Sequence, residues 1–164
     1  FLKFLLFLFL LFNSAHPANF IAGFVQVIDA DTIKISNYKI RLYGIDAPEK
    51  KQICQRPYFS FGFFSLNENY FCGELATNKL TEFLSDALIT CQVEDKKDYF
   101  GRFLGVCYKN KTNINQWLVE NGHAVAYIKY SKNYVKFEET AKENKVGLWS
   151  GKFLMPWEWR KKNK

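Results

Sequence analysis

The sequence predicts an α+β domain that is mainly β, and three observations support this fold class. Several short segments alternate apolar and polar residues, as strands with one buried face do. Other segments have the spacing or the capping residues of helices, and we expect about three of these. With 164 residues and 48% hydrophobic content, the chain is long enough for one domain with a sizeable core.

Residues 1–18 have the order of a secretory signal peptide. Lys3 precedes nine consecutive apolar residues, 4–12, and small and polar residues follow. The apolar run is too short to span a bilayer comfortably. We therefore expect export to the periplasm or the external medium, with cleavage after Ala15 or Ala18. An uncleaved anchor is the alternative, and only then would the protein contact a membrane.

Residues 32–36 and 39–43 predict a β-hairpin that turns at Asn37 and Tyr38. One face of this hairpin is polar and includes Arg41. The opposite face is apolar and consists of Ile33, Ile35, Ile40 and Leu42. A hairpin with this pattern would place its apolar face on the core.

Carboxylates flank the predicted hairpin at one end. Asp31 precedes the first strand, and Asp46 and Glu49 follow the second. Clustered carboxylates repel unless a cation neutralises them, and oxygen ligands suit Ca²⁺ better than Zn²⁺. Asp31 and Asp46 are therefore candidate metal ligands, Glu49 a candidate general base, and Arg41 a candidate clamp for an anionic substrate. The alternative is that each acidic residue only marks a turn.

A second charged turn, residues 95–102, lies between predicted strands at 88–94 and 103–108. It ends at Arg102, whose planar guanidinium suits the oxygens of a phosphoryl group. A solvated hairpin turn is the alternative. The formal net charge of +7 favours polyanionic partners, although a merely soluble basic protein has the same charge.

Three blocks in this order, V-x-D-x-D-T, R-L-x-G-I-D-A-P-E and D-x-x-G-R, resemble those of the thermonuclease family, the staphylococcal nuclease-like enzymes. The resemblance extends over about residues 24–149. It implies a five-stranded OB-type barrel that hydrolyses phosphodiester bonds of DNA and/or RNA. It also implies roles for five residues: Ca²⁺ binding by Asp31 and Asp46, general base catalysis by Glu49, and phosphate binding by Arg41 and Arg102.

The resemblance also implies that Tyr127 and Tyr130 line the nucleotide pocket and that Asp98 orients the second turn. Two residues depart from the family's pattern. Ala30 stands where Gly is usual, which concerns the first turn, and Phe100 stands where Tyr is common, which concerns a substrate contact.

Four cysteines behind a signal peptide predict two disulfides, for which three pairings exist. Cys91 and Cys107 lie on alternating stretches joined through the second turn, so they could face each other across neighbouring strands. That pairing leaves Cys54 with Cys72. A zinc site is the competing hypothesis, but the sequence has no C-x-x-C spacing and only two His.

The segment 50–71 has no steady period and predicts a long loop, closed at its base by the Cys54–Cys72 pairing. Its aromatic residues could stack on bases of an unpaired strand. We favour the alternative, in which they fold back onto the barrel.

Helices are expected at 73–86, from Asn113 or Asn115 to Glu120, and at 131–144. We assign residues 19–152 to the barrel domain. Residues 153–164 form a tail rich in Trp and basic residues, in which Trp packs on the body and the basic end is solvated; a nucleic-acid arm is the alternative.

Two functional hypotheses follow. The first is an exported, monomeric, Ca²⁺-dependent endonuclease of low sequence specificity. The second is a catalytically inactive OB-type module that binds nucleic acid or protein. An inactive module has no need of Arg41, Glu49 and Arg102 together with both aspartates, so we favour the enzyme.

Overall fold

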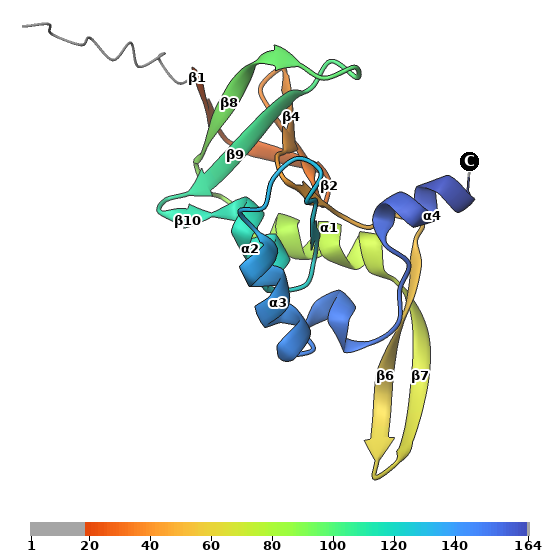
Figure 1. Cartoon of the computed structure of the whole chain (residues 1–164). Coiled ribbons are helices and arrows are strands. Elements are labelled where there is room, and N and C mark those ends of the chain that lie inside the picture. The colour runs from red at the N-terminus through yellow and green to blue at the C-terminus, as the bar shows by residue number, and fades with distance from the viewer. Residues whose placement is uncertain (1–18, 164) are drawn as a thin grey trace, which may run out of the picture.

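A strongly curled sheet forms the centre of the computed structural model, which describes residues 19–163 (Figure 1). All neighbouring strands in this sheet are antiparallel except β4 and β9, which are parallel. In spatial order the strands are β1 (Asn19–Gly23), β8 (Ile89–Lys97), β9 (Phe103–Lys109), β4 (Tyr38–Leu42), β3 (Thr32–Ile35) and β2 (Val25–Asp29), with β10 (Thr112–Asn113) beside β9. The α+β class with a curled, barrel-like sheet is confirmed.

The β3–β4 hairpin buries the apolar face that the sequence predicts. Its four residues, Ile33, Ile35, Ile40 and Leu42, are each at most 1% exposed. The turn lies at Ser36 and Asn37, one residue earlier than expected, and Ser36 has a positive φ of 51°. The one-residue difference leaves Tyr38 paired with Ile35 and does not change which face is buried.

Helices pack against the curled sheet and complete the core (Figure 1). The described residues contain four α-helices and one 3-10 turn: α1 (Cys72–Leu84), α2 (Ile114–Glu120), α3 (Val135–Glu143), η1 (Gly147–Ser150) and α4 (Pro156–Lys162). The first two agree with the sequence, and the Asn113 side chain caps α2 by accepting from the Gln116 amide. Helix α3 begins later than expected because the Ser131 hydroxyl accepts from the Asn133 amide, which favours a turn.

The predicted loop at 50–71 is wrong, because these residues form a two-stranded ribbon, β6 (Ile53–Phe61) and β7 (Phe64–Phe71). The ribbon projects from the body (Figure 1), and the aromatic side chains of residues 58–64 are exposed and do not fold back onto the barrel. Phe61 and Phe64, which pair across the strands, are 78% and 79% exposed. The dense aromatic run hid the alternation that normally identifies a strand.

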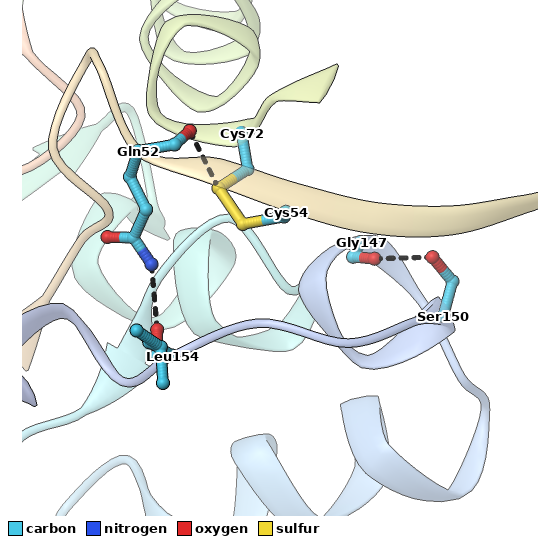
Figure 2. The surroundings of a disulfide bond; sticks show 6 residues. All are labelled: Gln52, Cys54, Cys72, Gly147, Ser150 and Leu154. Atoms are coloured by element: carbon cyan, nitrogen blue, oxygen red, sulfur yellow. Dashed lines mark hydrogen bonds between the residues drawn. A yellow bond between two sulfur atoms is a disulfide. The ribbon is translucent and has the colours of Figure 1, made fainter. Parts of the chain in front are cut away.

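Both predicted disulfides are confirmed. Cys91 and Cys107 are direct partners across β8 and β9, and Cys54–Cys72 joins the base of the ribbon to the start of α1. Beside the Cys54–Cys72 disulfide, the side-chain amide of Gln52 donates to the Leu154 carbonyl at 2.7 Å (Figure 2). This hydrogen bond ties the base of the ribbon to the C-terminal segment. Two disulfides are typical of an oxidising compartment outside the cytoplasm.

Within residues 19–163, no helix has both the length and the apolar character needed to cross a bilayer. The predicted signal peptide, residues 1–18, lies outside the described residues.

Candidate active site

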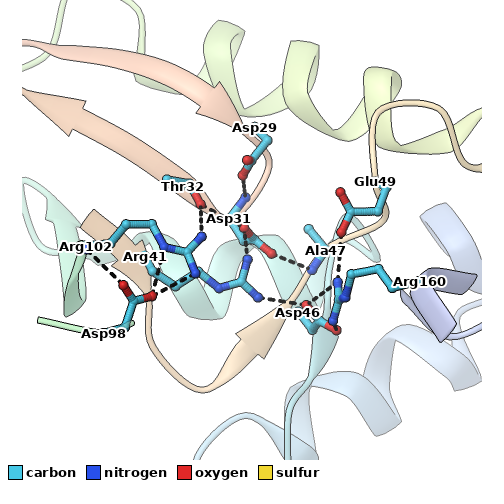
Figure 3. Close-up of polar contacts among 10 residues, drawn as sticks. All are labelled: Asp29, Asp31, Thr32, Arg41, Asp46, Ala47, Glu49, Asp98, Arg102 and Arg160. Carbon is cyan, nitrogen blue, oxygen red and sulfur yellow. Dashed lines mark hydrogen bonds and ion pairs between the residues drawn. The ribbon is translucent and has the colours of Figure 1, made fainter. Parts of the chain in front are cut away.

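The end of the β3–β4 hairpin brings Asp31, Arg41 and Asp46 together, as the sequence predicted (Figure 3). The Arg41 guanidinium donates to Asp46 Oδ1 at 2.7 Å and forms an ion pair with Asp31 Oδ1. Asp31 is 4% exposed and Asp46 is fully buried. Buried carboxylates require such partners, since a buried charge without one is strongly destabilising.

Local backbone geometry explains why the two aspartates meet. The backbone of Leu42 donates to the Asp31 carbonyl at 2.8 Å, and the Ala47 amide donates to Asp31 Oδ2 at 3.0 Å. Between them, Gly44 has φ +76°, which lets the chain reverse from β4 into β5 (Ile45–Asp46). Strand β5 pairs with β11 (Val125–Ala126), in which Val125 is the partner of Asp46, so the backbone of Asp46 is held by the sheet.

The turn before β3 adds a third carboxylate. Asp29 accepts from the Asp31 amide at 3.1 Å, and burial together with the charge of Asp31 raises the pKa of Asp29 to about 6. Ala30 in this turn is fully buried. It is not among the positive-φ residues of the described chain, so an alanine fits here without backbone strain.

Glu49 lies on a turn that packs against the start of α1. A Cβ at Gly73 would lie 2.0 Å from the Glu49 carbonyl oxygen, so only glycine permits this close approach. The backbone amide of Gln52 also donates to the Glu49 carbonyl at 2.7 Å. The backbone of Glu49 is therefore fixed, whereas its side chain is 43% exposed and accessible to substrate and water.

Arg102 is held by its own turn. Its guanidinium donates to Asp98 Oδ2 at 2.9 Å and its backbone amide donates to Asp98 Oδ1 at 2.9 Å, so Asp98 orients the turn as expected. Burial would raise the pKa of Asp98, but the hydrogen bonds and the charge of Arg102 lower it below its ordinary value. Arg102 also donates to the Thr32 hydroxyl at 3.3 Å, and the Phe100 ring lies 5.3 Å from its guanidinium carbon.

Thr32 links this turn to the first group of residues. Its hydroxyl donates to Asp31 Oδ1 at 3.1 Å while it accepts from Arg102. Through Thr32 and Asp31, the two predicted phosphate-binding arginines belong to one hydrogen-bonded network.

Sequence reasoning missed Arg160, which reaches the site from α4 (Figure 3). Its guanidinium donates to Asp46 Oδ2 at 2.7 Å and to Glu49 Oε1 at 3.0 Å. Burial would lower the pKa of Arg160, but Asp46 and Glu49 raise it above its ordinary value. The only sequence signal was the density of basic and aromatic residues in the tail, which had indicated a solvated end.

A cleft of about 620 Å³ opens beside these groups. Both predicted tyrosines line it: Tyr127 stacks on Trp157 with ring centroids 5.5 Å apart, and the Tyr130 carbonyl accepts from the Tyr43 hydroxyl at 2.7 Å. The cationic side chains that line the cleft are Arg41, Arg102, Arg160 and Lys161. Aromatic faces beside positive charge suit a nucleotide, whose bases stack and whose phosphates are anionic.

The carboxylates of the site offer oxygen ligands to a cation. Across residues 19–163, no group of three or more His, Cys, Asp and Glu side chains gathers as a metal cage would. However, one cationic group, the Arg160 guanidinium, contacts both Asp46 and Glu49. Their hard oxygen atoms therefore fit a shared cation of the Ca²⁺ type. Arg41 forms ion pairs with both Asp31 and Asp46 and so links the two carboxylates.

Comparison with known proteins gives a consistent match. Residues 39–151 match the family described as staphylococcal nuclease homologue. The succinoglycan biosynthesis protein ExoI of Rhizobium meliloti is 34% identical over 142 residues, covering 85% of this chain and 70% of that protein. An uncharacterized endonuclease of Escherichia coli is 32% identical over 144 residues, covering 83% and 82%. The micrococcal nuclease of Shigella flexneri is 30% identical over 167 residues, covering 90% and 84%.

Proposed function

We propose, since the chain belongs to the staphylococcal nuclease family, that it is a Ca²⁺-dependent endonuclease that hydrolyses DNA and/or RNA with low sequence specificity. That the protein is a phosphodiester-cleaving hydrolase with a nucleic acid substrate follows from the family. The single observation that best supports the finer proposal is that Arg41, Glu49 and Arg102 line one cleft.

Each residue has a role that its surroundings support. Glu49 accepts a proton from the attacking water, because its carboxylate is fixed at the backbone and open to the cleft. Arg41 and Arg102 bind the phosphate oxygens and stabilise the charge that develops on them. The rings of Tyr127 and Tyr130 contact the base or sugar.

Asp31 and Asp46 would hold a Ca²⁺ ion. When bound, such an ion would supply polarisation of a phosphate oxygen and of the attacking water. Asp46 is fully buried, and both of its oxygens contact arginines that line the cleft. Arg41, which contacts both aspartates, is positioned by them for the phosphate.

The two disulfides support a location in an oxidising compartment outside the cytoplasm. We propose that residues 1–18 are a signal peptide and that the mature protein acts as a monomer in the periplasm or outside the cell. The domain of residues 19–152 carries most of the site, and the tail of residues 153–164 contributes Arg160. Contact with a membrane is proposed only for a form in which the N-terminal segment is not cleaved.

The test is cleavage of single- and double-stranded DNA and RNA, with Ca²⁺ or with chelator. We expect cleavage only with Ca²⁺, and Glu49→Gln is expected to lower kcat by about 10²–10⁴ with little change in substrate binding. Full activity with chelator would remove the metal from the proposal. Binding of nucleic acid without any cleavage by the wild type would favour an inactive binding module.

A further inference from the structure

Arg160 occupies a position between two groups of the proposed mechanism. Its Nη2 donates to Asp46 Oδ2 at 2.7 Å, and its Nη1 lies 3.2 Å from Asp46 Oδ1 and 3.0 Å from Glu49 Oε1. Both oxygens of Asp46 and one oxygen of Glu49 thus face a single guanidinium. A guanidinium that contacts both oxygens of a carboxylate partners it through strong, charge-assisted hydrogen bonds.

We infer that Arg160 is an internal counter-cation that a metal ion must displace from Asp46 and Glu49, so that helix α4 sets the Ca²⁺ affinity of the site. This inference rests on the proposed function and adds a regulatory element to it. While Arg160 remains in place, both Asp46 oxygens and one Glu49 oxygen are engaged by its guanidinium.

The surroundings explain why such a counter-cation is needed. Asp46 is fully buried, and an ionised carboxylate at such a position is costly without compensation. Arg41 compensates part of this charge but is shared with Asp31. Arg160 supplies a second cation to Asp46, so the two arginines offset most of the charge of Asp31, Asp46 and Glu49.

The two arginines differ in how easily they can leave Asp46. The Arg160 side chain is 35% exposed, whereas that of Arg41 is 18% exposed. Helix α4 is held separately, by the buried Pro156 and by the stacking of Trp157 on Tyr127. Arg160 can therefore rotate out toward the cleft while the helix keeps its place, and a metal ion can exchange with it.

The experiment measures Ca²⁺ binding by titration calorimetry in the full chain, with Arg160→Gln as the test and Lys162→Gln as the matched control. Lys162 is exposed on the same helix, and among residues 19–163 it has no ion pair. If Arg160 occupies the position in roughly 90–99% of metal-free molecules, Arg160→Gln should lower the Kd for Ca²⁺ about 10–100-fold. Lys162→Gln should change it less than about threefold.

Thermal unfolding gives a second readout that does not depend on activity. Without Ca²⁺, Arg160→Gln should lower the midpoint by about 2–8 °C, because Asp46 loses one of its two cations. With saturating Ca²⁺ the difference from the wild type should disappear. Arg160→Lys keeps the charge but contacts fewer oxygens, so both effects should be intermediate, and it serves if Arg160→Gln does not fold.

The outcomes separate this inference from the proposed function. Equal Ca²⁺ affinities of the wild type and Arg160→Gln would overturn the exchange while leaving the metal role of Asp46 intact. Equal gains in Arg160→Gln and Lys162→Gln would assign the effect to net charge and also overturn it. If neither the wild type nor Arg160→Gln binds Ca²⁺, the metal role fails and the exchange fails with it.

Discussion

Arg41 and Arg160 contact the same buried carboxylate, Asp46, from opposite ends of the chain. Arg41 lies five residues from Asp46 and projects from β4 into the network with Asp31. Arg160 lies 114 residues away on a short helix and bridges Asp46 to Glu49. One arginine belongs to the barrel, and the other is brought to it by the C-terminal segment.

The difference shows that similar ion pairs can have different functions. Arg41 is held by two buried carboxylates and lines the cleft, so it can bind the phosphate without leaving its place. Arg160 is more exposed, and it lies on a C-terminal helix beyond the end of the family match at 39–151. We expect Arg41 to act in catalysis and Arg160 to control access to Asp46.

The largest expected effect tests the catalytic side of this comparison. Arg41→Lys keeps a positive charge but loses the planar fork that binds Asp31 and Asp46 together. We expect kcat to fall by about 10²–10³, with weaker substrate binding as well, and Arg102→Lys should cause a loss of the same size. Steady-state kinetics with saturating Ca²⁺ measures both.

Arg160→Lys is the matched control, because it is the same substitution on the same carboxylate. At saturating Ca²⁺ its kcat should stay within about threefold of the wild type, since the arginine is then displaced. A loss as large as that of Arg41→Lys would place Arg160 in direct contact with the substrate and would remove the distinction between the two residues.

The sequence was sufficient for the part of the site that local patterns define. The alternation of the β3–β4 hairpin places Asp31 and Asp46 at one end. The contact of Asp98 with Arg102 was expected from the family resemblance, and the two residues lie in one short turn. These contacts join residues that are close in sequence or on paired strands. Periodicity and turn preferences describe such pairs directly.

The parts that the sequence did not predict depend on long-range packing. The contact of Arg160 with Asp46 depends on packing of the C-terminal segment on the body. Trp157 stacks on Tyr127, and the Gln52 side chain donates to the Leu154 carbonyl. The β6–β7 ribbon was mistaken for a loop because aromatic residues filled positions where a polar residue would have revealed the alternation. Neither feature has a local signal of its own.

The two disulfides offer a structural test of the same comparison, with an intermediate expected effect. They close loops of similar length, with sequence separations of 18 and 16 residues, so removing either should cost about 3 kcal/mol of unfolding free energy. Urea unfolding of the Cys54→Ala/Cys72→Ala and Cys91→Ala/Cys107→Ala variants measures this cost.

Their effects on Ca²⁺ binding should differ. Cys54–Cys72 lies beside Gln52, which anchors the segment leading to Arg160, so its loss should loosen Arg160 and strengthen Ca²⁺ binding. Cys91–Cys107 links β8 to β9 within the barrel, and its loss should leave Ca²⁺ binding unchanged. Equal shifts in the two variants would contradict the separate attachment of Arg160. Mass spectrometry of the unreduced wild type should find no free thiol.

The smallest expected effect is the loss of stability at acid pH that the buried His123 causes. Burial, with a contribution from the charge of Lys79, lowers the pKa of His123 from 6.5 to about 4. The imidazole, whose ring centroid lies 5.4 Å from that of Trp117, is therefore neutral in the folded protein at pH values where it is charged in the unfolded chain.

Because the folded pKa is the lower one, the stabilisation is fully present above pH 6.5 and is lost as the pH falls toward 4. We expect a loss on the order of 1–3 kcal/mol over this window, measured by urea unfolding at several pH values, and His123→Gln should remove it. If His123→Gln retains the full loss, the imidazole is not its source and the burial of His123 does not cause the acid sensitivity.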